Sequence, residues 1–489
     1  MSARISRRAV AGFGAAAPFI RTGRARAAET ADVVVIGAGL SGLNAAWMLS
    51  DAGYDVVVLE GSKRVGGRAW TAREAEDQPE LGASQVGPSY ARGLDIIERL
   101  GLKLIAEDRP IMPFSYHLGG QLIAGRDWPD HPVNKTVGDE RKIGPQGMGG
   151  AFIHRYNAMK ELDDWLSPKL ASEDVSIADF MRRHGASPAA IRLAAIGQDV
   201  DDVSALGLMQ EDFRGTFEQQ FRSLRLDPKI EPAGAPEIWP KNIIGGTSVL
   251  PEAIAARLNR KVMFGKQVTA IDMDATGVDV RCLDGAVVRA KFVIAAIPFI
   301  LLRQIDISPR PDPLHAGAIE NIGYRDTTWF FVKIRDPFWQ ADGLEPSFFT
   351  DGALKTMWVL DNHSGAPNAP TKGPFKAMFL ITGRAGERLT SMPPDEAGRF
   401  LIAELERLRP ASKGQVEGVK FHSWGRTPLQ RGCRHNFKPG QITAFAEKMI
   451  EPWQRLHFCG EHTRRLEQGM ESAFESGERA AGEVLARLS

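Results

Sequence analysis

The sequence has few cysteines, almost no net charge and no metal-binding spacing, and each absence removes a class of protein. Three cysteines among 489 residues, Cys282, Cys433 and Cys459, allow at most one disulfide, which excludes a disulfide-stapled domain. None has zinc-ligand spacing, and the ten histidines form no HExxH motif, so no metal is implied. The formal net charge of +1 gives no reason to expect nucleic acid or an anionic membrane as a partner.

Long apolar runs are also missing. No stretch reaches the roughly 20 apolar residues of a bilayer-spanning helix, and none follows the last motif, so we expect no membrane span. The mildly apolar run at residues 9–20 follows Ser6-Arg7-Arg8 and precedes the small-residue site Ala25-Arg26-Ala27. Paired arginines before such a run are similar to a twin-arginine signal, so residues 1–28 predict export to a bacterial periplasm. The alternative is a disordered basic leader.

A glycine turn between two apolar runs lies near the start of the chain. The runs at residues 33–36 and 56–59 are short enough for strands buried on both faces. A GxGxxG pattern follows the first run, and residues 40–50 read as a helix. The residues of this turn that we expect to contact a dinucleotide are Gly37, Gly39, Leu40, Ser41 and Gly42.

Each glycine in such a turn has a mechanical reason. The first makes the tight turn, the second lets the backbone approach a pyrophosphate, and the third lets the helix pack against the strand. The helix N-terminus attracts the phosphates. Glu60 lies 21 residues beyond Gly39, near the usual offset for an acid that binds ribose hydroxyls. Because strand, turn, helix, strand and acid are all present, the stretch predicts a dinucleotide site rather than a chance glycine turn.

The next motif indicates which dinucleotide binds. Gly66-Gly67-Arg68 follows Glu60 within eight residues, and Leu81-Gly82-Ala83-Ser84 comes shortly after. The Gly-Gly-Arg extension resembles the FAD-binding signature of the flavin amine oxidase family, which includes monoamine and polyamine oxidases. Simple NAD dehydrogenases lack it. The resemblance implies FAD as the cofactor, with contacts from Gly67, Arg68, Ala83 and Ser84.

The last block of the chain resembles the same family. The sequences CGEHT at 459–463 and GMESAFESGERAA at 469–481 match the family patterns FAGEHT and GYMEGAxESGERAA. The resemblance implies that Gly460 and Glu461 bind FAD, the glutamate through hydroxyls, and that the backbone near Met470 faces the flavin ring. A helix N-terminus there would stabilise the negative charge of the reduced ring. A merely amphipathic helix explains the periodicity but not the GEHT block.

The resemblance also implies the fold, an α/β FAD-binding Rossmann-like domain combined with a discontinuous α+β substrate domain. FAD-binding segments are expected at 29–90, 242–305 and 451–489. The substrate domain is expected to be mostly helical at 91–241 and a mixed sheet at 306–450. Short strands are expected at 261–293, where Val268 presents its backbone to the adenine end of FAD in the family. A role as a core strand residue is compatible with this contact, because the contact is made by the main chain of Val268.

Cys433 and Trp424 raise the question of a covalent flavin. Trp424 precedes Cys433 by nine residues, the spacing in monoamine oxidases between a flavin-side tryptophan and the cysteine tethered to FAD. The resemblance therefore implies a catalytic Trp424 and a thioether at Cys433. Against the tether, the downstream Pro-Gly arrives one residue early, and many relatives bind FAD without one. A small buried thiol is the other interpretation.

Two substitutions depart from the family. The strand expected at 327–334 carries Trp329 where monoamine oxidases have a lysine near the flavin, and Lys333 lies roughly 13 Å farther along at ~3.3 Å per residue. The family's two cage tyrosines correspond to Arg434 and to Gln468 or Gly469. We assign catalytic positions to Trp329 and Arg434. Arg434 can bind a carboxylate or stack on a planar substrate; alternatively it is a rim residue facing solvent.

The resemblance implies an FAD-dependent oxidoreductase that removes a hydride from the carbon next to an amine nitrogen. The resulting imine hydrolyses to a carbonyl, and oxygen or a periplasmic electron carrier takes the electrons. Three alternatives stay open: a dehydrogenase or desaturase of the same fold acting on a non-amine, an NADPH monooxygenase, and a non-catalytic flavoprotein. The second is disfavoured because no further GxGxxG follows a strand. The oligomeric state is open, with a homodimer as one alternative.

Overall fold

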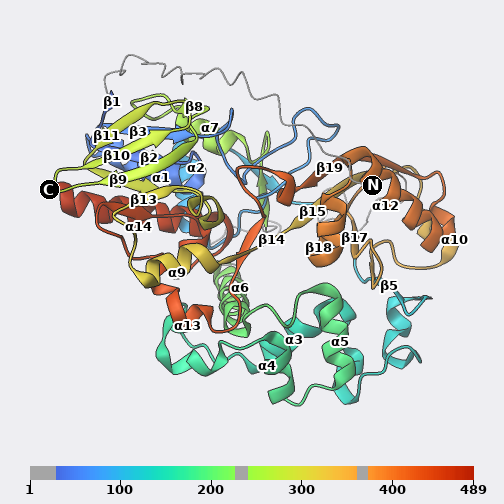
Figure 1. Cartoon of the computed structure of the whole chain (residues 1–489). Helices are drawn as coiled ribbons and strands as arrows, with labels where there is room; N and C mark the ends of the chain where they lie inside the picture. The colour runs from blue at the N-terminus through green and yellow to red at the C-terminus, as the bar shows by residue number, and fades with distance from the viewer. Residues whose placement is uncertain (1–28, 109, 226–239, 361–372) are drawn as a thin grey trace, which may run out of the picture.

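The protein has two β-rich halves with a group of helices below them (Figure 1). The structure, a computed structural model, describes residues 29–108, 110–225, 240–360 and 373–489. The expected export signal at 1–28 lies outside the described residues. Among the described residues, no helix is long and apolar enough to cross a membrane. The mixture of parallel sheet, second sheet and helices confirms the predicted α/β class.

The first half is built on a five-stranded parallel sheet assembled from distant pieces of the chain. Its order is β21 (Leu456–Phe458), β12 (Phe292–Ala295), β2 (Val33–Ile36), β3 (Val56–Glu60) and β8 (Met263–Phe264). Strands from the three separated segments that were expected to bind FAD therefore pair side by side. The glycine turn lies at the carboxyl end of β2, where parallel α/β sheets bind their ligands.

Both faces of this sheet are covered, which explains the apolar run at its centre. Val33 and Val35 join the core formed with α1 (Leu40–Asp51) and α14 (Gly469–Leu488), and α7 (Val249–Ala255) packs on α1. Val34 and Ile36 face the second sheet. That sheet has the order β1 (Glu29–Thr30), β11 (Val287–Ala290), β10 (Val278–Cys282), β9 (Val268–Met273) and β13 (Asp306–Ser308). The strands expected at 261–293 are thus confirmed.

The second half is a seven-stranded mixed sheet. Its order is β19 (Val416–Ser423), β15 (Thr327–Ile334), β18 (Phe375–Thr382), β17 (Thr356–Val359), β16 (Phe348–Thr350), β5 (Ser115–Leu118) and β6 (Gln121–Ile123). Only the β16–β5 pairing is parallel. The strand expected at 327–334 is confirmed with those bounds, and alternate residues of it pack with α12 (Pro394–Leu408).

The helices below the two halves come mainly from one segment. They are α3 (Met148–Tyr156), α4 (Ile177–Arg183), α5 (Pro188–Gly197) and α6 (Ala205–Arg225). Ser176 and Ser187 begin α4 and α5 as N-caps, each accepting a hydrogen bond from a backbone N–H at 3.0 and 3.1 Å. The segment before α3, residues 125–147, contains short 3-10 turns.

The remaining elements are short. The helices are α2 (Ala91–Arg99), α8 (Phe299–Leu302), α9 (Pro313–Asn321), α10 (Trp339–Asp342), α11 (Gly383–Thr390) and α13 (Gln441–Phe445). The strands are β4 (Leu104–Ala106), β7 (Lys241–Ile243), β14 (Gly323–Arg325) and β20 (Arg434–Asn436). Helix α2 packs against α14, and β13 pairs with β9, so both belong to the first half.

Strands β14 and β20 form a two-stranded antiparallel ribbon between the halves (Figure 1). In this ribbon Tyr324 lies opposite His435, and Arg325 lies opposite Arg434. The ribbon brings residues from two distant segments to the space between the parallel sheet and the mixed sheet. That space contains the candidate site.

Candidate functional site

One large cavity lies between the two halves. Its volume is about 1630 Å³, and residues from the glycine turn and from the mixed sheet both line it. Pockets for a single small ligand usually measure about 300–1,000 Å³. The cavity therefore has room for a dinucleotide and for a second molecule beside it.

The glycine turn forms the cofactor end of the cavity with bare backbone. Gly37 has φ +103°, and a Cβ on it would lie 2.8 Å from the carbonyl oxygen of Ala296. Gly39, Leu40 and Ser41 line the cavity, and a Cβ on Gly39 would meet nothing within 4 Å. A Cβ on Gly42 would lie 2.1 Å from the Gly37 carbonyl oxygen, and Gly42 does not line the cavity. Gly42 therefore supports the turn by close packing and does not contact a ligand.

The motifs around the turn are held against it. Gly66 N donates to the carbonyl oxygen of Ala38 at 2.7 Å, and Gly67 has φ +56° beside Gly39. The Glu60 carboxylate accepts the N–H groups of Ala38 and Ser62, both at 2.8 Å. The further predicted cofactor residues that line the cavity are Glu60, Gly67, Arg68, Ala83, Ser84, Val268, Cys433, Gly460, Glu461 and Met470.

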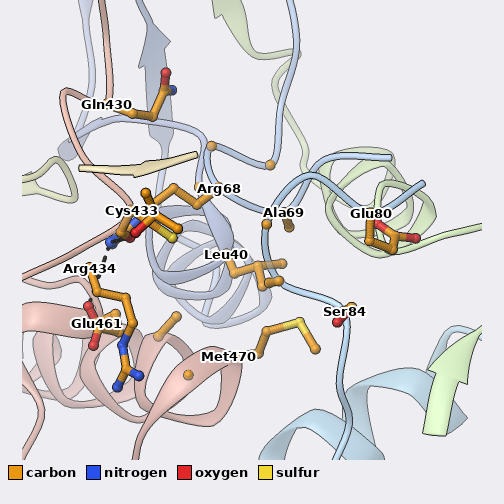
Figure 2. Close-up of a pocket in the computed structure, with 18 of the residues that line it drawn as sticks. Leu40, Arg68, Ala69, Glu80, Ser84, Gln430, Cys433, Arg434, Glu461 and Met470 are labelled. Carbon is orange, nitrogen blue, oxygen red and sulfur yellow. Dashed lines mark hydrogen bonds and ion pairs between the residues drawn. The ribbon is translucent and has the colours of Figure 1, made fainter. Parts of the chain in front are cut away.

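Glu461 is the centre of a buried ionic cluster. It accepts a hydrogen bond from His435 Nδ1 at 3.0 Å and pairs with Arg464 at 3.4 Å and Arg68 at 3.6 Å. Burial alone would raise the pKa of Glu461, but His435 and the two arginines hold it well below its usual range. Burial also lowers the pKa of His435. A permanently charged carboxylate is thus fixed at the cavity wall, where Figure 2 shows it with Arg68, Cys433 and Arg434.

Helix α14 presents its N-terminus to the same cavity. Met470 lines the cavity, and Figure 2 shows its side chain in the space between Leu40 and Ser84. The capping residue, Gln468, makes no side-chain hydrogen bond to the first turn. The uncapped N–H groups of a 20-residue helix favour negative charge nearby, as the sequence predicted for this position.

His462 is a further buried histidine at the cavity, within the GEHT block but without a role predicted from the sequence. It is 2% exposed, lines the cavity, and neither of its ring nitrogens has a partner among the described residues. Burial holds its pKa well below the usual range, so the ring is neutral, with one donor and one acceptor. Buried polar atoms normally have partners. A ligand rich in hydroxyl and phosphate groups would supply them, which fits FAD together with the open cradle at Gly39.

Side chains of the mixed sheet line another part of the cavity, which we call the substrate end. Trp329 lines it and packs with Phe331 and Trp358 at ring-centroid distances of 6.2 Å. The indole N–H of Trp329 is buried without a partner among the described residues. Lys333, four residues along β15, pairs with Glu76 and does not line the cavity. Lys333 therefore does not take the place of the family's lysine.

Trp424 lies elsewhere than predicted. It is fully buried beneath the loop at Gly82, where a Cβ would lie 2.9 Å from its ring. Its indole N–H donates to the carbonyl oxygen of Leu81 at 2.8 Å, and it does not line the cavity. The catalytic role predicted for Trp424 is corrected to packing, because the spacing to Cys433 did not reveal which side the indole faces.

Cys433 and Arg434 both reach the cavity. Cys433 N donates to the Arg325 carbonyl oxygen at 3.0 Å, and the Cys433 carbonyl oxygen accepts from Arg68 at 2.6 Å. Burial raises the pKa of the Cys433 thiol. The Arg434 guanidinium donates to Glu211 at 2.9 Å, and this pairing raises its pKa. Arg434 therefore lines the cavity, and 48% of its side chain is exposed.

Glu211 and Arg325 were not predicted from the sequence. Glu211 lies on α6 and lines the cavity; burial would raise its pKa, but Arg434, Arg464 and Arg325 lower it. Arg325 lies on β14, opposite Arg434. No motif marks either position, because their meeting depends on how α6 and β14 pack after folding. Among the described residues, no group of histidine, cysteine, aspartate and glutamate is placed to hold a metal ion.

The fold and this site define an FAD-binding oxidoreductase with a Rossmann-like cofactor domain. The sequence profile described as "Flavin containing amine oxidoreductase" matches residues 40–485. An amine oxidase [flavin-containing] B of Homo sapiens is 27% identical over 479 residues, covering 93% of this chain and 86% of the relative. An L-amino-acid oxidase of Pseudechis australis is 24% identical over 491 residues, covering 95% and 88%.

The fold is similar to solved structures as well. A structure of putrescine oxidase bound to putrescine superimposes with a TM-score of 0.71 at 22% identity, covering 94% of this chain and 99% of the other. This likeness concerns the fold. With the profile match over most of the sequence, the chain belongs to the flavin-containing amine oxidoreductase family.

Proposed function

We propose that this chain oxidises the carbon–nitrogen bond of a small amine inside the cavity, with FAD as its bound oxidant. The observation that carries the proposal is the single cavity lined both by the dinucleotide cradle and by Trp329 and Arg434. When bound, FAD accepts a hydride from the carbon beside the nitrogen. Family membership supports the same reaction class.

In this proposal, the chain's own residues bind the cofactor and orient the substrate. Gly39 would leave space for the pyrophosphate of FAD, and the α14 N-terminus would offer positive partial charge to the cofactor. Trp329 supplies a flat apolar wall for the substrate. Glu461 stays ionised between Arg68 and Arg464, so it accepts hydrogen bonds and does not exchange protons near neutral pH.

Anaerobic mixing of the holoenzyme with a panel of amines, followed by flavin absorbance, tests the reaction. Bleaching by amines, with a carbonyl product formed in equal amount, is the expected result. Bleaching by non-amine substrates alone would indicate a desaturase, and bleaching by NADPH alone a monooxygenase. No bleaching by any of the three would indicate a non-catalytic flavoprotein.

The electron acceptor and the export route are finer proposals. We propose oxygen or a periplasmic carrier protein as the acceptor. Peroxide formed in proportion to amine consumed supports oxygen, and flavin that stays bleached in air supports a carrier. The proposed periplasmic location is supported by Arg7-Arg8 and the small-residue site at 25–27. Replacement of both arginines by lysine in a bacterial host is expected to retain the enzyme in the cytoplasm.

We also propose a thioether between Cys433 and FAD. Its support is the cavity-lining position of the thiol and the nearby Arg68, which opposes the effect of burial on the thiol pKa. Flavin that stays with the acid-precipitated wild type, and that is released from Cys433→Ala, is the expected result. Release from the wild type would contradict the tether.

A further inference from the structure

Two arginines lie side by side at the substrate end of the cavity. Arg325 and Arg434 are directly opposite each other in the antiparallel β14–β20 ribbon, and both line the cavity. Directly opposite residues in such a ribbon point to the same face with Cβ atoms about 4.5–5.5 Å apart. Like charges in this arrangement destabilise the pair unless an anion lies between or beside them.

The protein supplies only part of the required negative charge. Glu211 binds Arg434 at 2.9 Å and also lies 3.7 Å from Arg464. Glu461 is shared by Arg464 and Arg68. Three guanidinium groups therefore share two carboxylates, and Arg325 adds a fourth positive charge beside them. The Arg325 guanidinium makes no hydrogen bond or ion pair with any residue in the part of the chain that the structure describes.

The electrostatics of Arg325 agree with a missing anionic partner. Burial and Arg434 lower the pKa of Arg325 below its usual value, although Glu211 and Asp199 act in the opposite direction. Arg325 is half-buried and lines the cavity. A half-buried cation without a full partner costs free energy, and an anionic ligand would reduce that cost.

We propose that Arg325 and Arg434 form a subsite for a carboxylate on the amine substrate, so that the substrates are amines that carry a carboxylate. This proposal rests on the proposed function and specifies its substrate class. Two planar guanidinium groups match the two oxygens of a carboxylate. The subsite occupies the position of one of the family's two cage tyrosines. Such a tyrosine favours a cationic amine without an acid group.

The test uses the holoenzyme and benzoate, an unreactive carboxylate, in a titration followed by the flavin spectrum. Arg325→Gln is expected to weaken benzoate binding roughly tenfold or more, the effect of one charge-assisted hydrogen bond. Glu211→Gln, which frees Arg434, is expected to tighten it. Arg310→Gln is the matched control, because it removes the same charge from a side chain that is 82% exposed. Thermal unfolding of Arg325→Gln is expected to equal or exceed the wild type, because like-charge repulsion is relieved.

A competing role for the same charge is stabilisation of the reduced, anionic flavin. In that case Arg325→Gln lowers the flavin midpoint potential and leaves benzoate affinity unchanged, which would overturn the subsite. Unchanged benzoate affinity without a shift in potential would overturn it too. The titration needs no turnover, so it stays informative if no amine bleaches the flavin. Two results together would overturn the subsite and still support amine oxidation. They are equal bleaching by amines with and without a carboxylate, and a benzoate affinity that Arg325→Gln does not change.

Discussion

The two ends of the cavity differ in what they are made of. The cofactor end is mostly backbone: a turn with φ +103° at Gly37, an open face at Gly39 and the uncapped start of α14. The substrate end is made of side chains from β14, β15, β20 and α6, which come from distant segments. Backbone recognition requires glycine at fixed spacing, whereas side-chain recognition depends on which strands pair and in what register. We therefore expect added atoms to disrupt the cofactor end and changes of charge to disrupt the substrate end.

The largest effect is expected from crowding the backbone of the cofactor end. In Gly42→Val the first added carbon would lie 2.1 Å from the Gly37 carbonyl oxygen and 2.8 Å from Ala296. We expect the free energy of unfolding to fall by about 3 kcal/mol or more and the flavin to be lost on purification. Thermal unfolding and flavin content measure both. Gly150→Ala is the control, because a Cβ there meets nothing within 4 Å. A Gly42→Val protein as stable as that control would refute the crowding.

The next largest effect is expected where the two ends meet, at Glu461. Glu461→Gln leaves Arg68 and Arg464 without their shared carboxylate, so we expect a loss of about 3–5 kcal/mol in chemical denaturation. Since the folded pKa of Glu461 is depressed, its contribution is full above the unfolded pKa of about 4.3 and disappears as pH falls through the folded pKa. The difference between the two proteins should therefore shrink in acid.

The matched control is Glu404→Gln, in which the lost partner is Arg407, whose side chain is 64% exposed. We expect less than about 1 kcal/mol from this surface pair. Equal losses of unfolding free energy in Glu404→Gln and Glu461→Gln would mean that the buried cluster stabilises the fold no more than a surface ion pair does.

A smaller effect is expected behind the substrate wall, at His422. It lies on β19 opposite Trp329, its ring packs 4.6 Å from that of Trp424, and its Nε2 is buried without a partner among the described residues. Burial lowers its pKa to about 4. Because the folded pKa lies below the unfolded value of about 6.5, the unfolded chain binds the proton first as the pH falls. The free energy of unfolding is therefore highest above about pH 6.5 and decreases as the pH falls towards about 4.

We therefore expect His422→Phe to flatten the fall in unfolding free energy between pH 7 and about 4.5, as measured by urea denaturation at several pH values. His154→Gln serves for comparison, because the His154 side chain is 67% exposed. An unchanged pH profile in His422→Phe would show that this buried ring does not drive the acid loss.

The same contrast explains what the sequence could predict. The strand–turn–helix unit and the GEHT block were readable because a backbone cradle fixes residue types locally. Trp424 was assigned to the wrong side, since a spacing of nine residues does not determine its orientation in the short turn Trp424–Arg426. The pairing of Arg325 with Arg434 joins strands more than a hundred residues apart, and Glu211 lies on α6, in which no motif was recognised. No local pattern encodes those meetings.

One measurement tests directly whether the two ends are separate: flavin content and the rate of flavin reduction by a carboxylated amine, determined together for two variants. Gly39→Ala keeps an allowed backbone, with φ −75° and ψ 174°, and its Cβ projects into the cavity, so we expect a folded protein with little flavin. For Arg325→Gln we expect full flavin content and slower reduction. An Arg325→Gln protein that loses flavin as Gly39→Ala does would contradict the account.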